Sequence, residues 1–291
     1  MVILLEYKNL ILYLDGQFVG ENISSVFGFA SALNCYLKVL HVIADPRESI
    51  PLMGDGMSVS MVEDMVESAV QLGLERKARA KEQFNLGVKE SGLQLVDKSG
   101  SFLPSVEWVE EGGRYDLTLV KHAKMSDVVF FPLKIDKKDV SQMIALNAVI
   151  FGSGRPVIII PEEKGILPSF QKILVAWNGS KESALAISVA LPFLKSAHQI
   201  EIFDLRMDAR ELIELNLVSD YLACHGVKAS ISDSAIVSQA IGREILKKIR
   251  SDHADLLVMG AYTQSRLRRL VLGGATRYVA ENAKIPVLMV H

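Results

Sequence analysis

The chain has 291 residues, of which 49% are hydrophobic and 23% are charged. This length allows two ordinary domains with large buried cores. The formal net charge is −2, and acidic and basic residues are mixed along the chain. A general nucleic-acid binder carries a basic surplus or stripe, which is missing from this sequence. We therefore expect no nucleic-acid partner.

Neither a membrane segment nor a disulfide framework is expected. The first apolar run, residues 10–14, is too short to span a bilayer and has no small-residue cleavage site, so we assign it to the first strand. The two cysteines, Cys35 and Cys224, lie in different halves of the chain. We interpret both as small buried hydrophobes rather than as a disulfide or a metal site. Their scarcity fits a reducing compartment, which favours the cytoplasm.

The first half alternates near-continuous apolar runs with segments of helical periodicity. Such alternation predicts a parallel sheet that is covered by helices on both faces. In the long helix, Met57, Met61 and Met65 follow one another at four-residue spacing, which favours a stripe packed in the core over an adaptable binding groove. The expected strands are 11–15, 37–43, 105–109, 128–132 and 156–161, and the expected helices are 19–35, 58–92, 114–124 and 139–151, the last with Asp139 as N-cap.

The second half repeats this plan after a charged stretch with Pro and Gly, residues 162–171. The segment LYLDG at 12–16 corresponds to VAWNG at 175–179, and SDVVFFP at 126–132 corresponds to ADLLVMG at 254–260. Two copies of one βα unit indicate domains at 1–161 and 172–291. The expected strands are 172–178, 199–205, 227–232, 255–260 and 285–291, and the expected helices are 179–194, with Ser180 as cap, 207–224, 238–250 and a last one that ends at 282.

A candidate phosphate site follows the fourth strand of the second half. The apolar run 256–260 ends at Gly260, and Gly273 and Gly274 precede a periodic segment, as in a strand, loop and helix. Glycine allows the backbone to approach an anion, and the N–H groups of a first helical turn point at it. Arg266, Arg268 and Arg269 add positive charge to the loop. Ordinary βα packing with a solvated basic loop is the alternative interpretation.

These residues resemble the tandem universal stress proteins, in which two universal-stress domains are fused, and the resemblance covers nearly the whole chain. Many members bind ATP through a pattern Gly-x2-Gly-x9-Gly-(Ser/Thr) after the fourth strand, together with an acidic residue that ends the first strand. The matching positions here are Gly260, Thr263, Gly273 and Gly274, so the spacing is kept while two residue types differ. Asn178 stands at the position of the family's acidic residue.

The resemblance implies two doubly wound α/β domains, each with a five-stranded, mainly parallel sheet, related by an internal pseudo-two-fold. It also implies that residues 156–160 and 286–290 pair antiparallel as the last strands of the two domains. The chain would thus form a pseudo-dimer within itself. Whether two chains associate further into a homodimer is left open.

For the second half we expect an adenine nucleotide, ATP with Mg²⁺, at the carboxyl ends of the first and fourth strands. The N–H groups of Gly273, Gly274 and Ala275 would hold the phosphates, Asn178 the ribose or base, and Leu205 would flank the base. Ser265 and Arg266 would make secondary phosphate contacts, and Thr263 and Thr276 complete the candidate residues. The first half, where Pro132 and Leu133 replace the glycines, is expected to have lost this site, and Asp15 is interpreted as a turn residue beside Gly16.

No catalytic residue and no metal ligand are assigned, because the known hydrolase, P-loop and zinc spacings are missing from the sequence. The expected function is that of a cytoplasmic stress-response protein that binds a nucleotide and acts through conformation or contact with an unidentified protein partner. Two alternatives remain. One is an interaction protein with vestigial sites, in which the helix at 58–92 or the groove between domains binds a partner or an apolar ligand. The other, suggested by some relatives, is a slow ATP hydrolase or autophosphorylating protein.

Overall fold

The computed structural model describes residues 7–18, 20, 22–43, 59–97, 102–134, 141–205, 211–232, 240–261 and 273–291. The N-terminal half forms β1 (Asn9–Tyr13), α1 (Asn22–Ala32), β2 (Tyr36–Ile43), α2 (Val59–Ser91), β3 (Gln94–Leu95), β4 (Ser105–Gly112), α3 (Tyr115–Ala123), β5 (Val128–Pro132), α4 (Ser141–Gly152) and β6 (Val157–Ile160). The C-terminal half forms β7 (Lys172–Trp177), α5 (Lys181–Ser196), β8 (Gln199–Asp204), α6 (Glu211–Cys224), β9 (Ser230–Ile231), α7 (Ile241–Ser251), β10 (Leu256–Gly260), α8 (Gly274–Asn282) and β11 (Val287–Val290).

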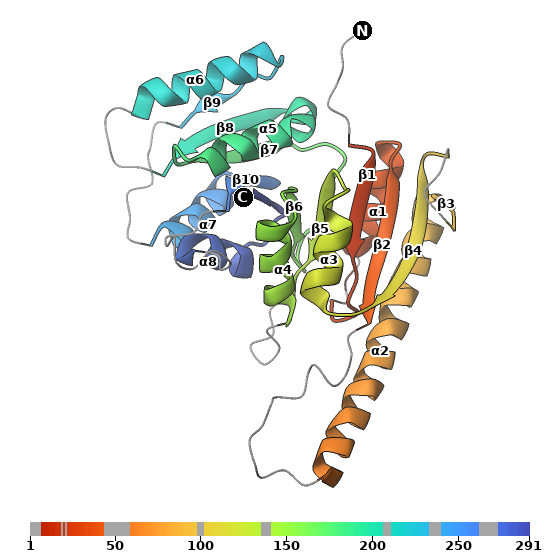
Figure 1. Ribbon diagram of the computed structural model, residues 1–291. Coiled ribbons are helices and arrows are strands. Elements are labelled where there is room, and N and C mark those ends of the chain that lie inside the picture. The colour runs from red at the N-terminus through yellow and green to blue at the C-terminus, as the bar shows by residue number, and fades with distance from the viewer. Residues whose placement is uncertain are drawn as a thin grey trace.

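These strands form one 11-stranded sheet in the order β3-β4-β2-β1-β5-β6-β11-β10-β7-β8-β9 (Figure 1). Neighbouring strands are parallel except β6 and β11, which run antiparallel with Ile158 opposite Leu288. The α/β class is therefore confirmed, and so is the antiparallel pairing of the last strands. In each half the strand order reverses beside the first strand, between β1 and β5 and between β7 and β10. In an open α/β sheet, ligands bind at such reversal points.

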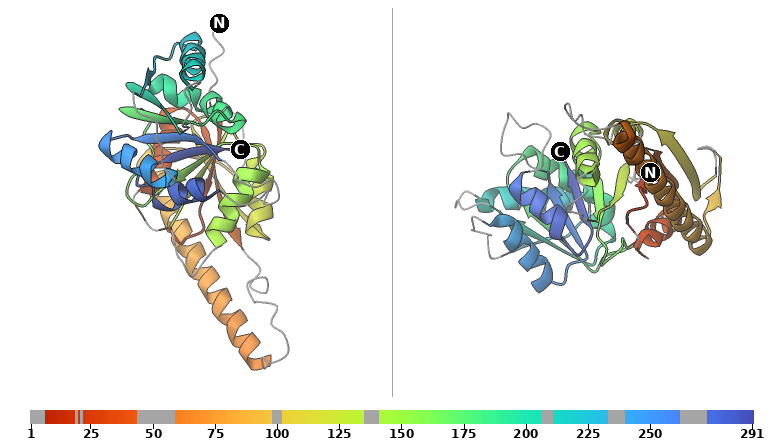
Figure 2. Two further views of the ribbon diagram at one scale, coloured as in Figure 1. Left: turned by 90° about the vertical axis from the view of Figure 1, so that its left-hand side faces the viewer. Right: turned by 90° about the horizontal axis from the view of Figure 1, so that it is seen from below.

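The sheet of the N-terminal half has one strand more than expected. The short strand β3 pairs with β4 at the edge and follows directly after α2, a helix of 33 residues that extends well beyond the sheet (Figures 1 and 2). Met61 and Met65 on this helix are 54% and 37% exposed, so the prediction of a core stripe was wrong for them. Met57 lies outside the described residues. Amphipathic spacing alone predicts a buried face, but here the helix runs past the end of the sheet that would cover it.

Most other elements agree with the sequence to within a few residues, as expected for boundaries read from periodicity. Ser180 is the N-cap of α5, since its side chain accepts a hydrogen bond from the Ser183 N–H. Asp139 and residues 207–210 lie outside the described residues. Cys35 is buried as predicted, whereas the expectation was wrong for Cys224, which is exposed at the end of α6. Among the described helices, none is long and apolar enough to span a membrane.

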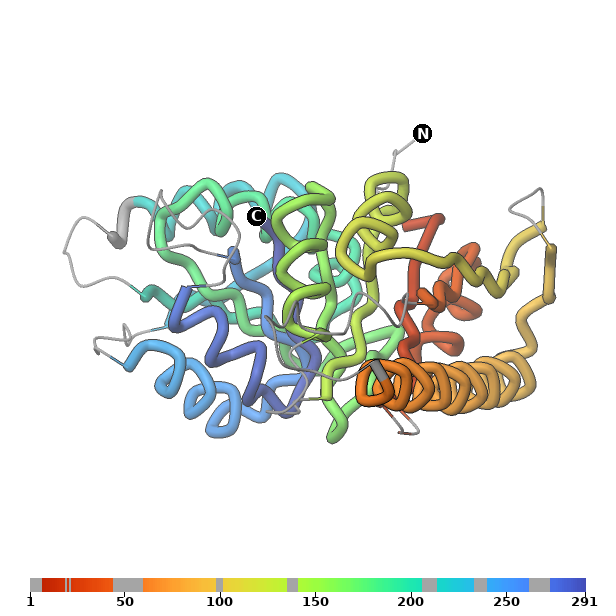
Figure 3. The backbone as a smooth tube through the Cα atoms, turned by 60° about the horizontal axis from the view of Figure 1, so that its bottom comes forward, coloured from red at the N-terminus to blue at the C-terminus, as the bar shows by residue number. Residues whose placement is uncertain are grey.

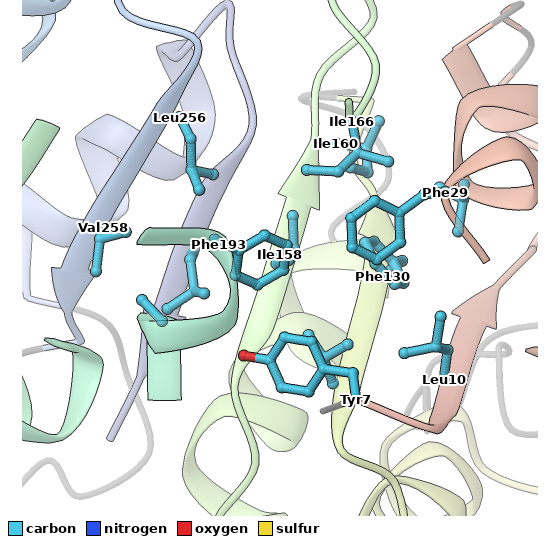
Figure 4. Close-up of a cluster of buried hydrophobic side chains, with 14 of the residues drawn as sticks. Tyr7, Leu10, Phe29, Phe130, Ile158, Ile160, Ile166, Phe193, Leu256 and Val258 are labelled. Atoms are coloured by element: carbon cyan, nitrogen blue, oxygen red, sulfur yellow. The ribbon is translucent and has the colours of Figure 1, made fainter. Parts of the chain in front are cut away.

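Side chains from both halves form one buried hydrophobic cluster on one face of the sheet, and this cluster includes several aromatic rings (Figure 4). The ring of Phe193 on α5 stacks on Phe29 of α1 at a centroid distance of 5.6 Å and lies 5.2 Å from the ring of Tyr7. The Tyr7 hydroxyl donates to the Val189 carbonyl in the other half. Phe170, from the stretch between the halves, lies 5.8 Å from Phe193. One continuous sheet and one shared hydrophobic core therefore extend across the predicted domain boundary between residues 161 and 172.

We expect Phe193→Ala to lower the free energy of unfolding by about 3–5 kcal/mol, because it leaves a cavity among rings of both halves. The whole chain should still unfold in one transition, followed by circular dichroism and by tryptophan fluorescence in urea. Phe102→Ala is the matched control, since Phe102 is 63% exposed, and it should change stability by less than about 0.5 kcal/mol. Two separate transitions, only one of them shifted, would show that the halves have independent cores.

Candidate functional site

The end of β7 is followed by a tight turn that positions Asn178. The Asn178 side-chain oxygen accepts hydrogen bonds from the backbone N–H of Ser180 at 3.1 Å and from the Ser180 hydroxyl at 2.7 Å. Gly179 adopts a positive φ of 73°, which the turn requires. Because a backbone N–H can only donate, the bonded atom of Asn178 is its oxygen. The amide NH₂ is thus the part of this side chain that remains for a ligand.

A cavity of about 160 Å³ opens beside this turn at the carboxyl ends of β7 and β10. One side is apolar and includes Leu205 after β8, Met259 on β10 and two residues of α7, Ile241 and Ile245. The opposite side is the loop into α8. The described lining residues are Ala176, Asn178, Leu205, Ile241, Ile245, Met259, Gly260, Gly273, Gly274, Ala275 and Thr276.

Seven of the residues singled out in the sequence therefore lie around one cavity: Asn178, Leu205, Gly260, Gly273, Gly274, Ala275 and Thr276. The other three, Thr263, Ser265 and Arg266, belong to residues 262–272, outside the described part of the chain. On the apolar side, sequence reasoning found Leu205 but missed Met259, Ile241 and Ile245. Ile241 and Ile245 are four residues apart and so face one side of α7, and that spacing could have pointed to a wall of the site.

The first turn of α8 faces the cavity with its backbone. Gly273 is the N-cap, with φ −61° and ψ 157°, and among the described residues no side-chain hydrogen bond caps the helix there. The first N–H groups of a helix have no partner within it and carry the positive end of the helix dipole. A Cβ added at Gly274 would stand in open space. The described residues therefore leave the start of α8 accessible to an anion.

Gly260 has a different reason to be glycine. A Cβ at this position would lie 2.6 Å from the Glu182 carbonyl carbon and from the Ser183 nitrogen, in the first turn of α5. The close packing of α5 on the end of β10 thus excludes any side chain at Gly260. The glycine that ends β10 is required by the fold, whereas a Cβ at Gly274 meets no neighbouring atom.

Gln142 occupies part of the corresponding crevice in the N-terminal half. Asp15 ends β1 in the same kind of turn, with one carboxylate oxygen accepting from the Gln17 N–H at 2.9 Å. Its other oxygen accepts from the Gln142 side-chain amide at 2.7 Å, and the Gln142 oxygen accepts from the Lys134 N–H at 3.0 Å. Gln142 is 2% exposed and lies on α4, which has 12 residues where α8 has 9. The extra helical turn places a side chain across the ends of β1 and β5.

Burial raises the pKa of Asp15, although the hydrogen bonds from Gln17 and Gln142 and the charge of Arg76 act in the opposite direction. The bond to Gln17 is the turn role predicted for Asp15. The position of Gln142 across the ends of β1 and β5 supplies a physical reason for the expectation that this half does not bind a nucleotide. Among the described residues, no cluster of His, Cys, Asp and Glu suitable for a metal ion occurs in either half.

We expect Gly260→Ala to lower the free energy of unfolding by about 1–3 kcal/mol, because α5 must move away from β10. Gly274→Ala is the matched control, since its methyl group enters open space, and it should change stability by less than about 0.5 kcal/mol. Urea unfolding of the two variants decides between these expectations. Equal stability of both variants would contradict the packing role of Gly260.

Comparison with known proteins now adds to this geometry. Residues 169–291 match the model of the universal stress protein family. A universal stress protein of Synechocystis sp. is 26% identical over 97% of this chain and 99% of its own length.

The solved structures show the same fold over the whole chain. A universal stress protein from Archaeoglobus fulgidus has a TM-score of 0.66 at 17% identity and covers 98% of this chain and 97% of its own. A putative universal stress protein from Pseudomonas aeruginosa has a TM-score of 0.54 at 13% identity, with 97% and 93% covered. Residues 169–291 thus match the universal stress protein family, and the resemblance of the whole chain to a tandem universal stress protein is confirmed.

Proposed function

We propose that the C-terminal half binds an adenine nucleotide, ATP, in the cavity between β7, β10 and α8. The observation that carries this proposal is the convergence of Asn178, Leu205 and the glycine-led start of α8 on one cavity. The cavity lies at the point where the strand order reverses, the usual ligand position in an open α/β sheet.

The parts of the nucleotide match the two sides of the cavity. The N–H groups of Gly274 and Ala275 receive phosphate oxygens at the positive end of α8. The base lies against the apolar side formed by Leu205, Ile241 and Met259. Asn178 holds the ribose or the base through its amide NH₂. Thr263, Ser265 and Arg266 remain proposed contacts from the loop after β10.

Mg²⁺ would enter with the phosphates, because Mg²⁺ keeps several waters and binds largely through the phosphates of its nucleotide. We assign no catalytic base, so the proposed role is binding that changes conformation or contact with a protein partner. We propose that the protein acts in the cytoplasm, as part of a stress response. Turnover is a separate question that single-turnover assays with labelled ATP answer directly.

We expect isothermal titration with ATP and Mg²⁺ to show saturable binding at one site per chain. Gly273→Val should weaken it at least tenfold, because the side chain narrows the approach to the start of α8. The dihedral angles of Gly273 suit valine, so the backbone itself is not strained. Gly28→Val, on the exposed side of α1 with open space at its Cβ, is the matched control and should bind as the wild type does. No heat and no thermal shift at millimolar ATP would refute the proposal.

We further expect Asn178→Asp to bind ATP several-fold more tightly. The aspartate keeps the turn bond to Ser180 and presents a carboxylate oxygen where the amide NH₂ stood, and a carboxylate accepts a stronger bond from a ribose hydroxyl. Titration with 2′,3′-dideoxy-ATP locates the contact. A gain that vanishes with this analogue places residue 178 at the ribose, and a gain that persists places it at the base. Unchanged affinity for both nucleotides would remove Asn178 from the site.

A further inference from the structure

The C-terminal half of α2 is fixed to the body of the protein. The Arg79 side chain donates to the Gly16 carbonyl at 3.0 Å. Further along, α2 lies beside α1 (Figure 3), where the ring of Phe84 packs against Phe27. The N-terminal half of α2 extends beyond the sheet (Figures 1 and 2), and we call its residues 59–75 the arm. Because an α-helix is a continuous hydrogen-bonded rod, the fixed half holds the arm in a defined direction.

One face of the arm is apolar and exposed. Met61, Met65 and Leu72 follow one another at intervals of four and seven residues, so their side chains lie in one line along the helix. They are 54%, 37% and 44% exposed. We call these three residues the apolar strip. Apolar groups in contact with water gain free energy when a partner covers them, and methionine is favoured on surfaces that adapt to a partner.

The arm also carries an unbalanced negative charge. Four acids and no lysine or arginine lie between residues 59 and 75: Glu63, Asp64, Glu67 and Glu75. All four are exposed, and none forms an ion pair within the part of the chain that the structure describes. Asp64 and Glu75 lie three residues after Met61 and Leu72, which places these two acids beside the apolar strip. A partner for this face therefore combines apolar groups with positive charge.

A second copy of the arm does not meet this requirement. Two arms side by side would bring the acids of both copies to the same seam, where like charges repel. A basic helix does meet it, because the strip is straight and has the residue spacing through which helices pack on one another. The chemistry of the arm thus selects a basic amphipathic helix from another protein.

The apolar strip leads to a cavity where the arm joins the body. Leu72 lies in the lining of this cavity of about 410 Å³, and so do Val42 and Ile43 at the end of β2. Ile43 is itself 43% exposed. At interfaces, large side chains that fill such recesses carry much of the binding energy. A helix that lies along the strip can place one apolar side chain here.

We propose that the arm binds a basic amphipathic helix of a partner protein. The apolar side chains of that helix lie along the strip, and its lysines or arginines lie beside Asp64 and Glu75. One apolar side chain enters the cavity next to Leu72. This contact does not rest on the proposed nucleotide site, because it lies in the other half of the chain and uses none of that site's residues.

Titration of the full chain with a synthetic helix tests the proposal. The probe is a fluorescent peptide of about three heptads with leucine at positions a and d and lysine at e and g, followed by anisotropy. We expect one saturable site per chain. Met65→Gln combined with Leu72→Gln should weaken binding about tenfold or more, because the strip becomes polar while glutamine still favours a helix. Leu217→Gln is the matched control, since Leu217 is 63% exposed on α6, and it should bind the peptide as the wild type does.

Charge variants test the second half of the proposal. Asp64→Asn combined with Glu75→Gln should weaken binding about fivefold or more at low ionic strength. At about 1 M salt this variant should differ little from the wild type, because salt screens exposed charges. A peptide with glutamate in place of lysine should bind about tenfold more weakly than the lysine peptide. Circular dichroism of each variant confirms that the helices are kept.

Three results would overturn the proposal. They are the absence of binding by the lysine peptide, equal affinity of the Met65 and Leu72 double variant and of Leu217→Gln, and equal affinity for the lysine and glutamate peptides. A dimer in sedimentation experiments that the strip substitutions abolish would overturn it in favour of a second copy. Titration of the same variants with ATP reports on the nucleotide site alone, so failure of one contact is distinguishable from failure of the other.

Discussion

The antiparallel pair of β6 and β11 is the interaction on which the arrangement of this protein depends. It joins two parallel sheets into one, with Ile158 opposite Leu288 at its centre. An unpaired last strand in either half would expose a row of backbone N–H and C=O groups. The pairing covers both edges within a single chain, and the aromatic cluster around Phe193 then buries side chains of both halves on one face. The continuous sheet and the shared core thereby hold the two halves in a fixed arrangement.

The same type of turn follows the first strand of each half, but the residues beyond the turn differ between the halves. Asp15 and Asn178 both end a first strand, and each accepts a bond from the N–H two residues later. Beyond the turn, α4 begins at Ser141 and places Gln142 across the ends of β1 and β5, whereas the described residues at the start of α8 line a cavity. Among the described residues, a side chain at the start of one helix, more than the identity of the acidic residue, thus distinguishes the two crevices.

The fold and most of the candidate site follow from local patterns in the sequence. Apolar runs and glycines located the strands, and the repeat of LYLDG as VAWNG placed Asn178 opposite the loop after β10. The reason for Gly260 could not be read this way, because it depends on how closely α5 approaches β10. The exposure of Met61 and Met65 also escaped prediction. Periodicity shows that a helix has an apolar face, but tertiary packing decides whether anything covers it.

The loop after β10 begins at Ala261, whose position is fixed by contacts that involve both halves. The Ala261 N–H donates to the Val290 carbonyl on β11, and the Ala261 carbonyl lies 2.9 Å from Nδ1 of His291. The His291 ring in turn packs edge-on against Phe151 of α4, with centroids 4.7 Å apart. Since α4 is the helix that carries Gln142, the element that places a side chain in the N-terminal crevice also supports the start of the C-terminal loop. The two halves therefore differ in their crevices without being independent of one another.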